Sequence, residues 1–247
     1  MGRPLGLFYG SEEGPPAMFF DPLYLLFVAP AFVLSLWASF RVKSAFNKYS
    51  KVRSSTGLTG AQAAERMLAA AGLRGVQVVR SHGFLTDHYN PINKTLALSE
   101  ATYDSPSVAA IGIACHEAGH ALQHAQGYQA LKLRSALVPT ANIGSTVGYL
   151  VMAAGLMFAS AKVVVAGAIL FSAVLAFQLV TLPVEFDASN RAKALSIQYG
   201  LILPQEREGM DRVLNAAALT YVAAAVSTLL TLLYFLMRAG LLGRRDD

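Results

Sequence analysis

Charged side chains are scarce in this chain: only 14% of its 247 residues are Asp, Glu, Lys or Arg, whereas 54% are hydrophobic. This imbalance excludes an ordinary soluble domain, in which about 25% of residues are charged. Four stretches have no charged side chain, and each supplies the roughly 20 apolar residues that cross a bilayer. They are residues 22–40, 135–161, 163–184 and 213–237. The sequence therefore predicts four transmembrane helices.

Cysteines and basic residues near the N-terminus are also few. Cys115 is the one cysteine, so no intrachain disulfide can form, and we interpret it as a small packed side chain. Ahead of the first span, Arg3 is the one basic residue, whereas Glu12, Glu13 and Asp21 are acidic. Because this pattern is wrong for a secretory signal peptide and the apolar run is too long, we interpret the first span as an uncleaved anchor.

The basic residues gather on one side of the predicted spans. Four spans place residues 41–134 and 185–212 on the same side, where they carry 11 and 4 of the 20 Lys and Arg residues. The positive-inside rule then predicts a cytoplasmic position for both segments, with the tails 1–21 and 238–247 outside a cell membrane. The basic C-terminal tail favours the opposite orientation. No nucleic-acid motif accompanies the net charge of +5, so we expect the lipid bilayer and not nucleic acid as a partner.

The segment 41–134 has the signals of a small α+β domain. Thr59 and Gln62 are spaced as a capping box, and Gly72 is a plausible end for the helix that they open. Residues 76–79 ("VQVV") and 94–98 ("KTLAL") have the composition of strands, with the turn-rich "DHYNPINK" before the second. The sequence therefore predicts one amphipathic helix followed by a small sheet.

A second helix is predicted to follow the sheet and to carry most of the chemistry. We expect Ser105 to cap it, Pro106 to occupy its first position and Gly127 to end it. His116 and His120 lie one turn apart, about 6 Å along the axis, so two imidazoles can converge on one ion. In such H-E-x-x-H sites zinc activates water, and the glutamate after the first histidine moves the proton.

The third metal ligand must come from another part of the chain. His124 is about 12 Å along the helix from His116, whereas two ligands of one zinc lie within about 4 Å of each other, so we expect His124 to be a polar residue near the helix end. The longer metzincin pattern fails as well, because it needs a histidine where Gln126 stands. Glu185, directly after the third span, is the best candidate. Asp187 is its rival, although on a helix it would be rotated by about 200° from Glu185.

Five segments in this order resemble a known family from about Asp21 to the C-terminus. The family is the bacterial membrane-bound neutral zinc metallopeptidases of the YugP-like type. The segments are "DHYNPINKTLALS", "CHEAGHALQHAQGY", "LKLRSALVP", "VTLPVEFDASNRA" and "LNAAALTYVAAA". The resemblance implies one catalytic zinc ion, with His116 and His120 as ligands and Glu117 as general base.

A shorter segment is similar to a second group. "EFDAS" resembles the E-x-x-A-D segment of the HtpX-type membrane gluzincins, which implies Glu185 as the glutamate ligand. This chain departs from that segment at Ser189, where those proteins have aspartate, and from the YugP-like type at Asn190, where arginine is usual. We therefore expect Ser189 or Asn190 to support a ligand histidine by a hydrogen bond.

Together these features predict a mainly α membrane protein with a small zincin-like cytoplasmic domain at residues 41–134 and a helical segment at 185–212 that carries the third ligand. The predicted activity is zinc-dependent endopeptidase cleavage of peptides or membrane proteins. Substrate is expected to pair with residues 94–98 as an edge strand. His88, Tyr89 and Tyr199 are candidates for stabilising the oxyanion. The alternative is a membrane scaffold that keeps zinc without hydrolysis, but such a site has no need of Glu117.

Overall fold

The computed structural model describes residues 21–242, so residues 1–20 of the predicted N-terminal tail and the end of the C-terminal tail lie outside the described residues. Four long apolar helical segments dominate it, as predicted, and each is long enough to cross a membrane. Two of them are α1 (Pro22–Tyr49) and α7 (Ala161–Gln198). The other two are the interrupted segment α5 (Gln129–Ile143), η2 (Gly144–Gly148) and α6 (Tyr149–Met157), and the segment η3 (Pro204–Glu206) with α8 (Arg207–Arg238).

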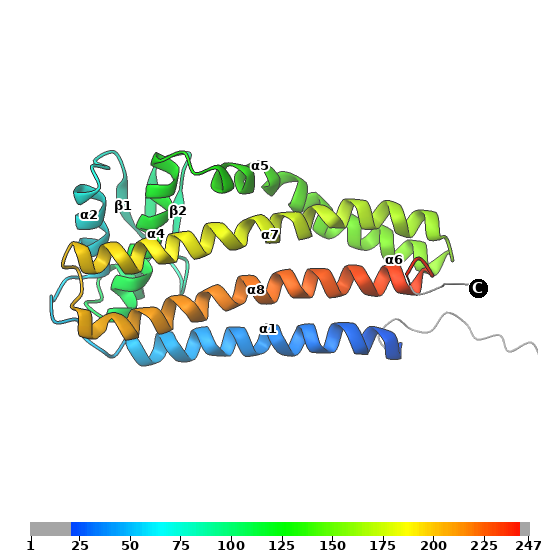
Figure 1. Ribbon diagram of the computed structural model, residues 1–247, viewed down its shortest axis with the longest axis horizontal. Coiled ribbons are helices and arrows are strands. Elements are labelled where there is room, and N and C mark those ends of the chain that lie inside the picture. The colour runs from blue at the N-terminus through cyan, green and yellow to red at the C-terminus, as the bar shows by residue number, and fades with distance from the viewer. Residues whose placement is uncertain (1–20, 243–247) are drawn as a thin grey trace, which may run out of the picture.

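These helices form an elongated bundle with a small domain at one end. Helix α8 runs between α1 and α7 along most of the length of the bundle. The segment from α5 to α6 lies against α7 and extends away from the domain (Figure 1). The domain comprises α2 (Gly60–Ala70), β1 (Gln77–Ser81), β2 (His88–Asn90), β3 (Thr95–Ser99), α3 (Glu100–Tyr103) and α4 (Val108–Ala125). The predicted fold class, a mainly helical chain with a small α+β part, is confirmed.

The sheet corrects two predictions. Its strand order is β1-β3-β2, with β1 parallel and β2 antiparallel to β3, so the strand at 94–98 is central and not an edge. Strand β2 lies inside "DHYNPINK", which the sequence had indicated as a turn. The burial of β3 agrees with its central place, because its last four residues are all buried, as expected of a strand covered on both faces.

The caps of the two domain helices fit the sequence only in part. The capping box of Thr59 and Gln62 is present on α2, and Gly72 follows that helix with a φ of +78°, as predicted. Helix α4 begins at Val108 and not at Pro106, because the hydroxyl of Ser107, not that of Ser105, accepts the hydrogen bond of Ala110 N–H. Gly127, with a φ of +67°, follows its C-terminal end as expected.

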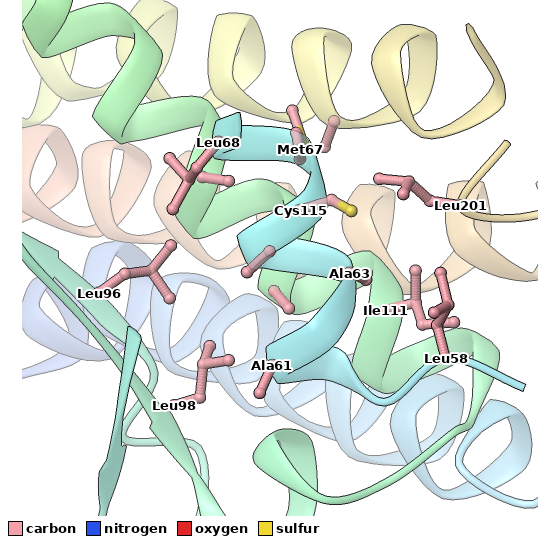
Figure 2. Packing of buried hydrophobic residues seen from close by; sticks show 14 of the residues in the cluster. Leu58, Ala61, Ala63, Met67, Leu68, Leu96, Leu98, Ile111, Cys115 and Leu201 are labelled. Atoms are coloured by element: carbon pink, nitrogen blue, oxygen red, sulfur yellow. The ribbon is translucent and has the colours of Figure 1, made fainter. Parts of the chain in front are cut away.

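Helix α4 is the centre of the hydrophobic core. Ile111 and Cys115 on α4 pack with Ala63 and Met67 on α2 and with Leu96 on β3, all fully buried (Figure 2). Cys115 is therefore the packed, free cysteine that the sequence indicated. Burial on all sides fixes the rotation of α4 about its axis, which decides where its histidines point.

Candidate metal centre

His116, His120 and Glu185 come together where α4 meets α7. Glu185 Oε2 lies 3.2 Å from His116 Nε2 and 3.6 Å from His120 Nε2, and one ligand atom from each residue falls within 4.8 Å of the others. Only 13%, 10% and 3% of these side chains is exposed. The cluster thus offers two imidazole nitrogens and one carboxylate oxygen in a largely buried site.

The cluster forms because α7 is one continuous helix. It extends past residue 184, where the apolar run ends, and carries Glu185 into the domain beside α4. Gly119, inside the H-E-x-x-H motif, permits this contact, since a Cβ atom there would lie 2.7 Å from the backbone oxygen of Ala188. Neighbouring side chains on the α7 face, Val184, Ala188 and Ala192, are fully buried. A close backbone crossing therefore brings the carboxylate to the two imidazoles.

Glu117 lies beside the cluster and outside it. Its side chain is buried, and its charge acts on His120 by Coulomb attraction. Glu117 is not one of the three candidate ligands, so its carboxylate would remain able to accept a proton beside a metal that they hold. This is the arrangement that a general base for water requires.

Each imidazole is tied at Nδ1, which leaves Nε2 for a metal. Ser189 Oγ lies 3.1 Å from His116 Nδ1, and the Gln123 carbonyl accepts from His120 Nδ1 at 3.0 Å. Gln123 is fully buried and donates from Nε2 to Val184 O and to Asp187 Oδ2, both at 2.8 Å. Such partners fix the tautomer and the ring orientation of a ligand histidine.

The charges of the cluster support one another. Burial disfavours the ionised form of Glu185, but hydrogen bonds and attraction from His116 and His120 outweigh it and hold the pKa of Glu185 well below its usual range. Burial also lowers the pKa of His120, yet its hydrogen bond and attraction to Glu185, with help from Glu117, raise that pKa overall. The buried carboxylate of Glu185 is therefore held in its ionised form beside the two imidazoles.

The structure separates the other predicted residues from the cluster. His124 Nδ1 lies 2.9 Å from the Tyr89 hydroxyl, near the helix end as predicted. Asp187 pairs with Arg191 and Gln123. His88 Nδ1 contacts the backbone oxygen of Thr86 at 2.8 Å, and Tyr199 packs on the core of the domain. Asn190 is exposed, so of the two residues expected to support a histidine it is Ser189 that contacts one.

Three residues near the cluster were not predicted from the sequence: Gln123, Arg134 and Tyr221. Gln123 could have been noticed, because it is a polar residue three positions after His120 on a buried face. Arg134 and Tyr221 lie on α5 and α8, and their closeness to Glu185 depends on how those helices pack. No pattern within one helix indicates such contacts.

The donor set fits zinc. Zinc binds imidazole nitrogen and carboxylate oxygen, and catalytic zinc sites use three protein ligands with one position open for water or substrate. His116, His120 and Glu185 supply these three donors from two helices. The buried partners of His116 and His120 match the outer contacts that zinc ligands need.

Comparisons with known proteins identify the family of the chain. Residues 24–240 match the family model described as "Putative neutral zinc metallopeptidase". The chain is 48% identical over 215 residues, 87% of its length and 96% of the relative's, to "Putative membrane protease YugP" of Bacillus subtilis (strain 168). No solved structure matches it. A chain with four candidate membrane-spanning helices and this His-His-Glu cluster therefore belongs to the family of neutral zinc metallopeptidases that the sequence resembled.

Proposed function

We propose that the protein is a membrane-embedded zinc-dependent endopeptidase. The observation that carries the proposal is the convergence of His116, His120 and Glu185, with Glu117 buried beside them. Family membership supports the same conclusion. A site built to hold zinc for structure alone usually has four protein ligands, and it has no use for a base next to its first ligand.

Three residues of the site bind the metal ion, and a fourth transfers the proton. His116, His120 and Glu185 hold the ion, while Ser189 and Gln123 keep the imidazoles in the required tautomer. When bound, zinc supplies a Lewis acid for the scissile carbonyl and lowers the pKa of a water molecule towards 7. Glu117 accepts the proton of the attacking water and passes it to the leaving amine nitrogen.

Strand β2 is the edge to which an extended substrate is proposed to pair. The edges of the sheet are β1 and β2, and β2 packs against α4, the helix that carries the two histidines. A peptide added beside β2 would therefore run along the active helix, with main-chain hydrogen bonds that depend little on sequence. Peptides and the tails of membrane proteins are the substrates that such an edge accepts.

The site is proposed to work at the cytoplasmic face of the cell membrane.

The test compares the purified wild-type protein with Glu117→Gln on a peptide library. We expect Glu117→Gln to keep its zinc and to lose about 10²–10⁴ in kcat, the usual contribution of a general base. Glu185→Ala should instead lose zinc, as measured by metal analysis after dialysis. Equal cleavage by wild type and Glu117→Gln would reject the mechanism. A wild-type protein that holds zinc and cleaves nothing in the library would favour the scaffold alternative.

A further inference from the structure

Arg134 stands on the side of Glu185 that faces away from the histidines. Glu185 Oε2 is the oxygen close to His116 and His120, whereas Oε1 lies 3.8 Å from Arg134 Nη2. That distance is too long for a hydrogen bond, so the two groups attract each other without the guanidinium using its donors. Among residues 21–242, a cation that makes no hydrogen bond to Glu185 thus lies next to the candidate metal centre.

The surroundings of Arg134 hold its guanidinium in place and leave it unsatisfied. Its Nε is buried and has no hydrogen-bond partner among residues 21–242. The Phe177 ring lies 6.0 Å from its Cζ, and the charge also acts on the Tyr221 hydroxyl, which in turn interacts with Glu185 and Glu117. About a third of the side chain, 32%, remains exposed. A buried donor without a partner costs free energy, whereas the exposed part of the side chain is where a substrate can reach the guanidinium.

We propose that Arg134 is a catalytic residue that binds the scissile carbonyl oxygen as it becomes negative. The proposal rests on the proposed peptidase function. When water attacks, a carbon–oxygen bond forms, the carbonyl π electrons move onto the oxygen, and the water proton goes to Glu117. The guanidinium is planar and always charged, so its N–H groups can stabilise that oxygen before the carbon–nitrogen bond breaks.

A purely supporting role for Arg134 fits the geometry less well. An arginine that positions Glu185 would use its N–H groups on Oε1, as in the bidentate pairs common between arginine and carboxylate. Here the separation of 3.8 Å leaves Nη2 without a hydrogen bond to Glu185, and the side chain is partly exposed. The earlier oxyanion candidates His88, Tyr89 and Tyr199 make their printed contacts away from the cluster, whereas Arg134 lies 3.8 Å from the carboxylate of Glu185.

The experiment uses the full-length, zinc-loaded protein in detergent and the variants Arg134→Gln and Arg134→Lys. Lys132→Gln, an exposed cation on the same helix, is the matched control. Three dissociation constants are measured: for zinc by chelator competition, and for two ligands by calorimetry. The first ligand is a tripeptide analogue in which a phosphinic group, a tetrahedral anion, is flanked by alanine on both sides. The second is acetohydroxamate, which binds zinc but has no tetrahedral anionic group. Cleavage kinetics give kcat and KM.

We expect Arg134→Gln to bind zinc and acetohydroxamate within about threefold of wild type. Its affinity for the phosphinic tripeptide and its kcat should both fall by about 10²–10³, the range seen when one oxyanion donor is removed, while KM changes little. Arg134→Lys should recover part of both losses, and it provides the comparison if Arg134→Gln does not fold. Lys132→Gln should behave as wild type.

Two results would overturn the proposal. Equal phosphinic affinity in wild type and Arg134→Gln is the first. The second is a weakened zinc affinity whose effect on kcat disappears at saturating zinc, since Arg134 would then only position Glu185. If wild type cleaves nothing and yet needs Arg134 to bind the phosphinic tripeptide, the peptidase function fails while the anion-binding role of Arg134 stands.

Discussion

Gln123 is the buried polar residue that joins the two helices of the site. Its carbonyl accepts from His120 on α4, and its amide group donates to Val184 O and Asp187 on α7. Both ends of its side-chain amide make hydrogen bonds at this junction, and no part of it is exposed. One side chain therefore fixes both the tautomer of a candidate ligand and the register between α4 and α7.

Replacing Gln123 by leucine keeps the volume and removes the acceptor for His120 Nδ1. We expect zinc affinity to fall about 10–100-fold, the usual effect of losing such an outer partner. The measurement is competition with a chromophoric chelator at pH 7. Gln129→Leu, at an exposed position on α5, serves as the control and should leave zinc affinity unchanged. Wild-type affinity in Gln123→Leu would show that the tautomer of His120 is fixed by other means.

At this scale the sequence predicted the residues that share one helix or one short segment. The spacing of His116 and His120 follows from helix geometry, which also allows only one of Glu185 and Asp187 to face the site. Glu185 was preferred because it directly follows the third span and matches the glutamate of the HtpX-type segment. Arg134 could not be found in this way. It meets Glu185 only because α5 packs against α7.

Among the elements, the crossing of η2 and α7 depends on glycine. A Cβ atom on Gly148 would lie 2.7 Å from Phe171 N, and one on Gly144 would lie 2.4 Å from Leu170 O. The backbones of the two helices are thus in direct contact, which suits membrane helices that associate by close packing.

Gly148→Ala should lower the free energy of unfolding by about 1–3 kcal/mol, because the added methyl group forces the two backbones apart. Thermal unfolding in detergent gives the measurement. Gly75→Ala is the control, since a Cβ atom there meets nothing within 4 Å, and its midpoint should not fall. An unchanged midpoint for Gly148→Ala would mean that η2 and α7 can separate at no cost.

Glu206 connects η3 to the loop after α1. It accepts hydrogen bonds from Ser54 Oγ at 3.1 Å, from Ser55 N–H at 2.6 Å and from Leu203 N–H at 2.8 Å. Burial acts to raise the pKa of Glu206, but these hydrogen bonds outweigh it and lower that pKa from its ordinary value of 4.5. The ionised carboxylate therefore favours the folded state.

A lowered pKa in the folded state gives stability that is fully present above pH 4.5 and is lost as the pH falls through the lowered value. We expect Glu206→Gln to reduce the free energy of unfolding by about 1 kcal/mol at pH 7, with allowance for partial exposure. Unfolding of wild type and variant is compared from pH 7 to pH 3, and the difference should shrink with acid. Glu208→Gln, exposed and paired with Arg212, should show a smaller difference at every pH.

The sheet shows what composition alone cannot decide. "KTLAL" was recognised as a strand, but its burial on both faces, and hence its central place, depends on α4 and on a partner strand hidden in "DHYNPINK". A three-residue strand such as β2 is too short for its pattern to be distinguished from a turn.

For the whole molecule, the distribution of charge predicts the orientation in the membrane. The domain end should face the cytoplasm, and the loop between α6 and α7 should face outside. Ile92, 94% exposed on the domain, and Phe158, 76% exposed at the opposite end, report on the two sides. Cys115 is buried, so the native thiol should not interfere with labelling.

Single substitutions Ile92→Cys and Phe158→Cys test this orientation in intact spheroplasts with a membrane-impermeant maleimide. We expect Phe158→Cys to react at once and Ile92→Cys to react only after the membrane is permeabilised. Unsubstituted protein is the control for background. The reverse pattern would place the candidate metal centre outside the cytoplasm and would agree with the basic C-terminal tail.

The length of α7 has a mechanical consequence. Its 38 residues form a rod of about 57 Å that is anchored in the bilayer at one end and holds Glu185, Asp187 and Ser189 near the other. Helices adjust their tilt when lipid chains become longer or shorter, and a continuous helix carries that tilt along its length. We therefore expect Gln123 and the close crossing at Gly119 to keep α4 and α7 together when the bilayer thickness changes, so that the domain tilts with α7 as one unit.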